Sequence, residues 1–87
     1  MWLKPEDYNA VGQILAAARA EVDLSQKDLA TRLRKPQSFV SSYENGNRRI
    51  DVLELLVIAE GIGTDPARLF AKVVREFGAP KGKRRKG

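Results

Sequence analysis

Four short hydrogen-bonding side chains lie close together in the middle of the chain. They are Gln37, Ser38, Ser41 and Ser42. We expect them on the outward side of a short helix over residues 36–43. Glutamine can pair with adenine through two hydrogen bonds, and serine can donate to or accept from several bases. Side chains of these types are therefore suited to contact base edges exposed in a groove of a nucleic acid. For Gln37 and Ser38, the alternative is that they only serve the N-terminus of their own helix.

Candidates for phosphate contacts flank this helix on both sides. Ser25 is suited to cap a preceding helix, whose positive N-terminal end favours a phosphate. Amide and cationic side chains precede and follow the helix over residues 36–43, here called the reading helix. The expected phosphate contacts are Ser25, Gln26, Lys35, Asn45, Arg48 and Arg49. The alternative is that these are charged or polar loop residues kept in solvent.

Positive charge is concentrated around the same helix. The 87 residues include 16 Lys and Arg against 11 Asp and Glu, for a net charge of +5. Five of the basic residues belong to the segment 81–86, so residues 1–80 are neutral overall. Within residues 27–49 six cations stand against two acids, and the rest of 1–80 has a net charge of −4. A basic face on an otherwise acidic small domain indicates polyanion binding in one orientation.

The composition argues against several other classes of protein. The chain has no Cys and no His, which removes disulfides, thiolate metal ligands and the usual acid/base residue of enzymes. We expect no enzymatic activity, no metal and no cofactor. No apolar run approaches the ~20 residues of a membrane span, and the first residues are too soon broken by Pro5 to be a signal peptide. We therefore expect a cytoplasmic protein of a prokaryote, associated with the nucleoid and not with a membrane.

The reading helix needs a scaffold, and the sequence predicts an all-α fold of five helices. Pro5 and Pro36 suit the first turn of a helix, and Ser25 is a good N-cap. Asp51 with Glu54 three residues later has the pattern of a capping box. The expected helices cover about residues 5–21, 25–33, 36–43, 51 to 61 or 63, and 64–77.

We expect residues 1–78 to form one DNA-binding domain, with a helix-turn-helix pair at about 25–43. Residues 79–87 are expected to be a disordered basic tail, because Lys, Arg and Gly cannot bury a core. Apolar residues at helical spacing predict the buried stripe of the first helix. Its members are Tyr8, Val11, Leu15, Ala18 and Val22.

Several short segments carry a family resemblance. They are Leu24-Ser25-Gln26, Leu29-Ala30, Phe39-Val40 and Glu44-Asn45-Gly46. Together they resemble the helix-turn-helix of the phage-repressor/Cro family, the xenobiotic-response-element (XRE) type. The resemblance covers about residues 11–70 and implies a compact five-helix, lambda-repressor-like DNA-binding domain.

The resemblance also implies roles for individual residues. Gln26 matches the family's phosphate-contacting glutamine. Arg19 and Glu44 match an ion pair that links the first helix to the end of the reading helix, with no contact to bases. Positions that contact bases in the resembled repressors are matched by Gln37, Ser38 and Ser42. For Arg19 and Glu44, the alternative is two unrelated surface charges.

One residue departs from the family pattern. Arg34 stands where the family usually has a turn glycine. A residue with a Cβ would have to accept a positive φ there, at some cost in strain. The departure concerns the local geometry of the turn more than the fold.

The fourth and fifth helices carry more apolar residues than a small core can cover. The candidates for a dimer interface are Leu53, Leu56, Val57, Phe70, Val74 and Phe77. Covering this face with a second copy would give a two-fold homodimer. The alternative is that Trp2 and Leu3 fold back over the fifth helix and close the core.

The leading hypothesis is a sequence-specific DNA-binding transcriptional regulator, a repressor. It would read the major groove of double-stranded DNA with helix 36–43, as a dimer on an inverted repeat. One alternative is the antitoxin of a toxin–antitoxin pair, whose apolar faces or tail would hold a toxin as protein partner. Another is a nonspecific nucleic-acid binder acting through the basic tail.

Overall fold

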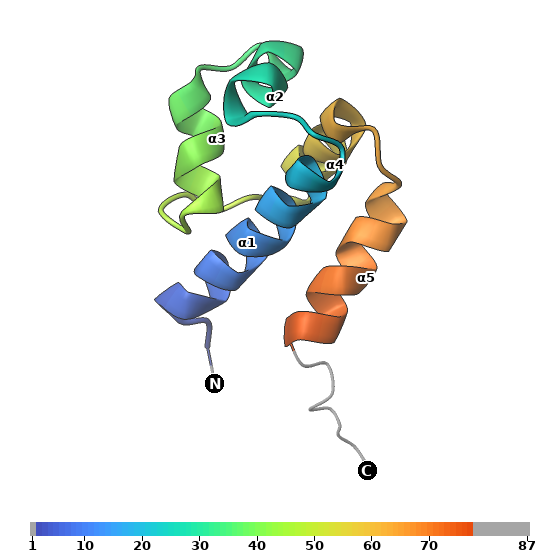
Figure 1. Cartoon of the computed structure of the whole chain (residues 1–87). Helices are drawn as coiled ribbons and strands as arrows, with labels where there is room; N and C mark the ends of the chain where they lie inside the picture. Colours follow the sequence, from blue (N-terminus) through green and yellow to red (C-terminus); the bar gives the residue numbers. More distant parts are fainter. Residues whose placement is uncertain (1, 78–87) are drawn as a thin grey trace.

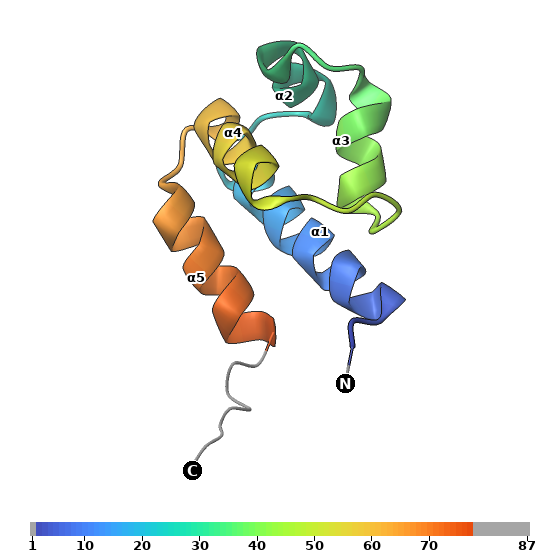
Figure 2. The same ribbon diagram turned by 180° about the vertical axis from the view of Figure 1, so that it is seen from behind.

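Five α-helices follow one another along residues 2–77, the part of the chain that the computed structural model describes. They are α1 (Pro5–Glu21), α2 (Gln26–Leu33), α3 (Gln37–Glu44), α4 (Val52–Ile62) and α5 (Pro66–Phe77). Figures 1 and 2 show α1 and α5 side by side in opposite directions, with α2 at the end of the molecule away from the start of α1. Helix α3 packs on α1 and α2, and α4 packs on α2 and α5. The predicted all-α, five-helix fold is confirmed.

Side-chain caps set where these helices begin. The Ser25 hydroxyl accepts a hydrogen bond from the backbone N–H of Asp28 at 2.9 Å, and the Asp28 carboxylate accepts from the Ser25 N–H at 3.2 Å. Asp51 and Glu54 form the same reciprocal pair at α4, at 2.7 and 3.1 Å. Helix α3 begins one residue later than predicted, because Pro36 has an extended ψ of 154° and is the N-cap.

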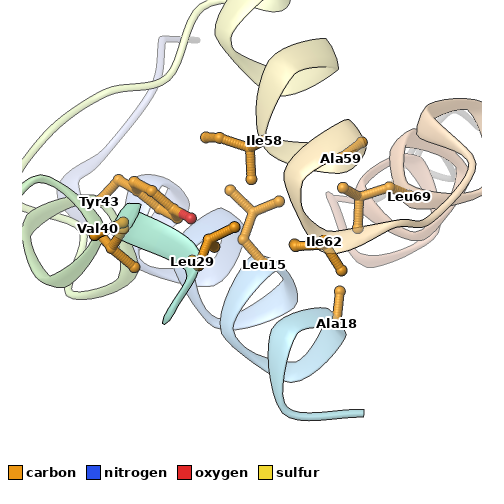
Figure 3. Packing of buried hydrophobic residues seen from close by; sticks show 10 residues of the cluster. Leu15, Ala18, Leu29, Val40, Tyr43, Ile58, Ala59, Ile62 and Leu69 are labelled. Atoms are coloured by element: carbon orange, nitrogen blue, oxygen red, sulfur yellow. The ribbon is translucent and has the colours of Figure 1, made fainter. Parts of the chain in front are cut away.

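One apolar core joins these helices (Figure 3). The largest fully buried side chains are Leu15 of α1, Leu29 of α2, Val40 and Tyr43 of α3, Ile58 of α4 and Leu69 of α5. Burial of an aliphatic side chain of this size contributes about 1.5–3 kcal/mol. Because α3 contributes two of these residues, its inward side is held by the core while its other side stays available.

The stripe predicted on the first helix ends earlier than expected. Leu15 and Ala18 are buried as predicted, but Val22 is 46% exposed. Helix α1 ends one residue before Val22, and Asp23 turns the chain with a φ of 59°. Val22 therefore no longer follows the helical period that would have placed it inward.

The outward sides of α4 and α5 remain apolar and exposed. The six residues predicted for this face are all exposed: Leu53, Leu56, Val57, Phe70, Val74 and Phe77. Trp2 is 82% exposed, so the alternative in which Trp2 closes the core is wrong. Leu3 lines a cavity together with Val73 and Phe77. The tail predicted at 79–87 lies outside the described residues.

Two kinds of feature are absent between residues 2 and 77. None of the helices in this range combines the length and the hydropathy that a membrane span requires. Nor do three or more His, Cys, Asp or Glu side chains come together there as a bound metal ion would require.

Arg34 occupies the turn between α2 and α3 in a conformation that favours glycine. Its φ and ψ are 58° and 43°, which confirms the positive φ predicted from the sequence. The Arg34 N–H donates to the carbonyl of Thr31 at 3.2 Å, and the Lys35 N–H donates to that of Ala30 at 3.0 Å. The left-handed residue thus closes α2 as a C-cap. For a residue with a Cβ this conformation costs about 1–2 kcal/mol.

Arg34→Gly should therefore raise the free energy of unfolding by about 0.5–1 kcal/mol, because relief of strain exceeds the extra entropy that glycine gives the unfolded chain. Arg34→Ala is the matched control, since it removes the same side chain but keeps the Cβ. Urea unfolding of the three proteins measures the difference. A glycine variant no more stable than the alanine variant would contradict the assignment of strain.

Candidate nucleic-acid interface

The start of α3 presents two of the predicted base-reading side chains to solvent. Gln37 and Ser38 are exposed in its first turn, whereas Ser41 and Ser42 are half-buried about one turn further on. Within residues 2–77 the Ser38 hydroxyl forms no hydrogen bond to the helix start, and Pro36 caps α3 without a side-chain bond. A ligand that approaches α3 from its N-terminal end would meet Gln37 and Ser38 first.

A series of hydrogen bonds links Gln37 to the first helix. Arg19 of α1 donates from Nε and Nη2 to the two carboxylate oxygens of Glu44, at 2.8 and 3.0 Å. Gln26, at the start of α2, donates from Nε2 to the same carboxylate at 2.9 Å. Gln37 donates from Nε2 to Oε1 of Gln26 at 3.4 Å. These four side chains, here called the Glu44 network, join α1, α2 and α3 through polar contacts.

The ion pair in the Glu44 network is largely buried. The Glu44 side chain is 5% exposed and that of Arg19 is 16% exposed. Nη1 of Arg19 also donates to the carbonyl of Leu24 at 2.6 Å. The hydrogen bond to Glu44 raises the pKa of Arg19 against the opposing effect of burial, so the guanidinium stays charged. The ion pair predicted from the family resemblance is present, and the alternative of two unrelated surface charges is wrong.

Gly12 allows α1 to approach the end of α3. A Cβ at this residue would lie 2.3 Å from the carbonyl oxygen of Tyr43 and 2.5 Å from that of Glu44. Because both contacts are to backbone, a side chain here would push the two helices apart and strain the ion pair. Sequence reasoning missed this role. The available signal was a glycine inside a helix, where it costs about 1 kcal/mol relative to alanine and so has a reason to be present.

The cations expected to contact phosphates fall into two groups. Lys35 and Arg48 both lie over the ring of Phe39 on α3, with Lys35 Nζ 5.4 Å and Arg48 Cζ 4.7 Å from the ring centre. Arg49 instead lies over the ring of Tyr8 on α1, at 4.9 Å. The two consecutive arginines are therefore supported by different helices. Such cation–π contacts orient side chains that would otherwise be free in solvent.

The other three phosphate candidates lie at helix ends. Ser25 caps α2, and the Gln26 carboxamide is bonded within the Glu44 network. Their surroundings include the first N–H groups of α2, which carry the positive end of the helix dipole. Asn45 is exposed at the C-cap of α3. The following residue, Gly46, turns the chain with a φ of 80°, and its backbone passes close to Asn9 of α1.

Tyr43 lies on the inward side of α3 and is buried, so it is not available to contact a ligand. Its hydroxyl has no hydrogen-bond partner within the described residues. Burial raises the pKa of Tyr43, so the phenol remains neutral and is not an acid or base at physiological pH. The exposed groups around α3 are donors, acceptors and cations, which suit binding to a polyanion with polar edges.

Comparison with known proteins agrees with this geometry. A family model described as helix-turn-helix matches residues 15–69, more than half of the chain. The control protein C.MunI of Mycoplasma sp is 31% identical to this chain over 58 residues, which are 67% of this chain and 78% of that protein.

Two solved structures resemble the whole arrangement of helices. An XRE-family like protein from Pseudomonas syringae pv. tomato str. DC3000 superposes with a TM-score of 0.73 at 45% identity, over 82% of this chain and 87% of that one. The restriction-modification controller protein C.AhdI from Aeromonas hydrophila superposes with a TM-score of 0.70 at 30% identity, over 76% of this chain and 96% of that one.

Arg19→Met should lower the free energy of unfolding by about 3 kcal/mol, because it leaves the Glu44 carboxylate nearly buried without a counter-charge. Adding Glu44→Gln should recover part of that loss, since an amide oxygen can still accept from Gln26. Arg68→Met, at an exposed position on α5, is the control and should change stability by less than about 0.5 kcal/mol. Further loss in the double variant would contradict the assigned role of the buried charge.

Proposed function

The chain belongs to the XRE-type helix-turn-helix family of DNA-binding transcription regulators, and on that premise we propose that it is a sequence-specific repressor. Residues 1–78 are the DNA-binding domain, and 79–87 are a basic tail beyond it. The family consists of regulators and not of enzymes, and we propose that this chain has no catalytic activity of its own. The protein is located in the cytoplasm and binds DNA of the nucleoid.

The Glu44 network is the observation that carries this proposal. It supports α3 from two other helices and ends on Gln37, an exposed side chain at the N-terminal end of α3. That end of such helices enters the major groove. Gln37 then pairs with an adenine through its N6 and N7. Ser38, Ser41 and Ser42 contact neighbouring bases. Because Ser41 and Ser42 are half-buried, they contact only base edges that lie close to α3.

Phosphate contacts on both edges of the groove fix the register of α3. On one edge the first turn of α2, with Ser25 and Gln26, faces one strand of the duplex. On the other edge Lys35 and Arg48, supported by Phe39, face the opposite strand. Asn45 and Arg49 extend the second edge along the loop after α3. Contacts of this kind position a protein on DNA without reading its sequence.

A second copy of the chain covers the exposed apolar face of α4 and α5. Leu53, on this face, is 72% exposed, and large exposed apolar patches mark interaction sites. Two copies related by a two-fold axis place two α3 helices on one face of the DNA. Their half-sites would then lie about 10–10.5 bp apart on an inverted repeat.

Selection of bound duplexes from random-sequence DNA tests the proposal as a whole. The expected result is enrichment of one symmetric sequence. Binding without enrichment would favour the tail-driven nonspecific binder and would overturn sequence-specific recognition. A stable complex with a toxin-like protein from the native host would instead favour the antitoxin alternative.

Gln37→Ala should relax discrimination at one base pair of each selected half-site by about 1–3 kcal/mol, while binding to random DNA stays unchanged. The reason is that the substitution removes a base contact and no phosphate contact. Gln13→Ala, at an exposed position on α1, is the matched control and should change neither. Competition binding with single-base variants of the selected site provides the measurement. Equal losses on selected and random DNA would show that Gln37 does not read a base.

A further inference from the structure

Arg48 is the most restrained of the exposed cations around α3. Its Nη1 donates to the carbonyl of Arg49 at 2.8 Å and to Oε1 of Glu54 at 3.1 Å. Its Nη2 donates to Oε2 of Glu54 at 2.9 Å. One face of the guanidinium lies on the ring of Phe39. The side chain is thus held by its own loop, by α3 and by α4, although it is 41% exposed.

These contacts use three of the five N–H donors of the guanidinium. The two that remain are the Nε–H and one N–H of Nη2, and no hydrogen bond within residues 2–77 uses them. They share one edge of the planar group, so they form a two-donor fork. Such a fork matches two oxygens of a phosphate.

We propose that Glu54 is a positioning residue for DNA binding, which holds Arg48 so that its unused fork receives one backbone phosphate. This inference rests on the proposed function, in which Arg48 is a phosphate contact. It assigns to an acidic residue a favourable part in binding a polyanion. The simple electrostatic expectation is the opposite, because a carboxylate near DNA repels it.

Glu54 is itself fixed, and this is why it can orient Arg48. Its carboxylate accepts from the backbone N–H of Asp51 at 3.1 Å, and its own N–H donates to Asp51 Oδ1 at 2.7 Å. The hydrogen bond from Arg48 lowers the pKa of Glu54, so the carboxylate is ionised at neutral pH. The capping box of α4 therefore serves two purposes, since it starts the helix and sets the direction of a loop arginine.

Two substitutions at residue 54 keep the cap and disturb the contact with Arg48. Glu54→Gln retains an oxygen for the Asp51 N–H, as capping boxes allow, but loses the charge and one acceptor. Glu54→Asp retains the charge but is too short to reach Arg48 in the same way, while Asp28 shows that aspartate completes such a box in this chain. Glu60→Gln is the control, since it removes the same charge from an exposed position on the same helix.

Affinity for the selected duplex, measured by fluorescence anisotropy, should fall roughly 3- to 10-fold for Glu54→Gln and Glu54→Asp relative to Glu60→Gln, the size of one positioned hydrogen bond. Melting temperatures of the free proteins show that the variants are folded. In an Arg48→Ala background the same substitutions should have no effect on affinity, because the group they position is gone.

Two results would overturn this role for Glu54. One is binding by Glu54→Gln that is as tight as or tighter than that of Glu60→Gln, which would make Glu54 a competitor of the phosphate. The other is a loss that persists in the Arg48→Ala background, which would place its effect elsewhere. A wild-type protein that selects no duplex would remove the proposed function together with this inference. If the wild-type protein selects a duplex but the Glu54 variants give either of the first two results, the role of Glu54 is overturned and sequence-specific binding still stands.

Discussion

The buried carboxylate of Glu44 fixes the position of α3 and of the exposed side chains at its start. A carboxylate that is 5% exposed must be matched by donors, because an unpaired buried charge costs several kcal/mol. Those donors come from Arg19 on α1 and Gln26 on α2. The position of α3 is therefore tied to two other helices by directional bonds, where apolar packing alone would tolerate small rotations. Gly12 makes this arrangement possible, since it leaves the space in which the end of α3 meets α1.

The exposed cations around α3 are also held in place, but by weaker interactions than those of the Glu44 network. Phe39 and Tyr8 provide aromatic faces for loop and turn cations, and the cap of α4 holds Arg48. Arg34 instead adds strain, because it keeps a left-handed conformation without the glycine that would relieve it, as Asp23 also does after α1. Local strain of this kind tends to lie near functional elements, and here it lies directly before the reading helix.

Much of this organisation was predictable from local sequence. Ser25, Asp51 and the apolar periodicity of the first helix depend only on near neighbours, so the starts of α2 and α4 and the burial of Leu15 and Ala18 were predicted correctly. The burial predicted for Val22 was wrong, because a helical period does not show where the helix ends. The contacts of Gly12, the bond between Gln26 and Gln37, and the pair of Arg48 with Glu54 depend on distances between helices. Such distances arise from packing, and the sequence pattern alone does not contain them.

In the proposed complex two copies of α3, one from each chain of a dimer, lie in the major grooves of two half-sites. Methylation interference on the selected duplex distinguishes this arrangement from minor-groove binding, because dimethyl sulfate modifies guanine N7 in the major groove and adenine N3 in the minor groove. Interference is expected at guanine N7 positions of the major groove, in two clusters about 10–10.5 bp apart on one face of the duplex. Interference confined to minor-groove adenines, or a single cluster without a symmetric partner, would contradict this arrangement.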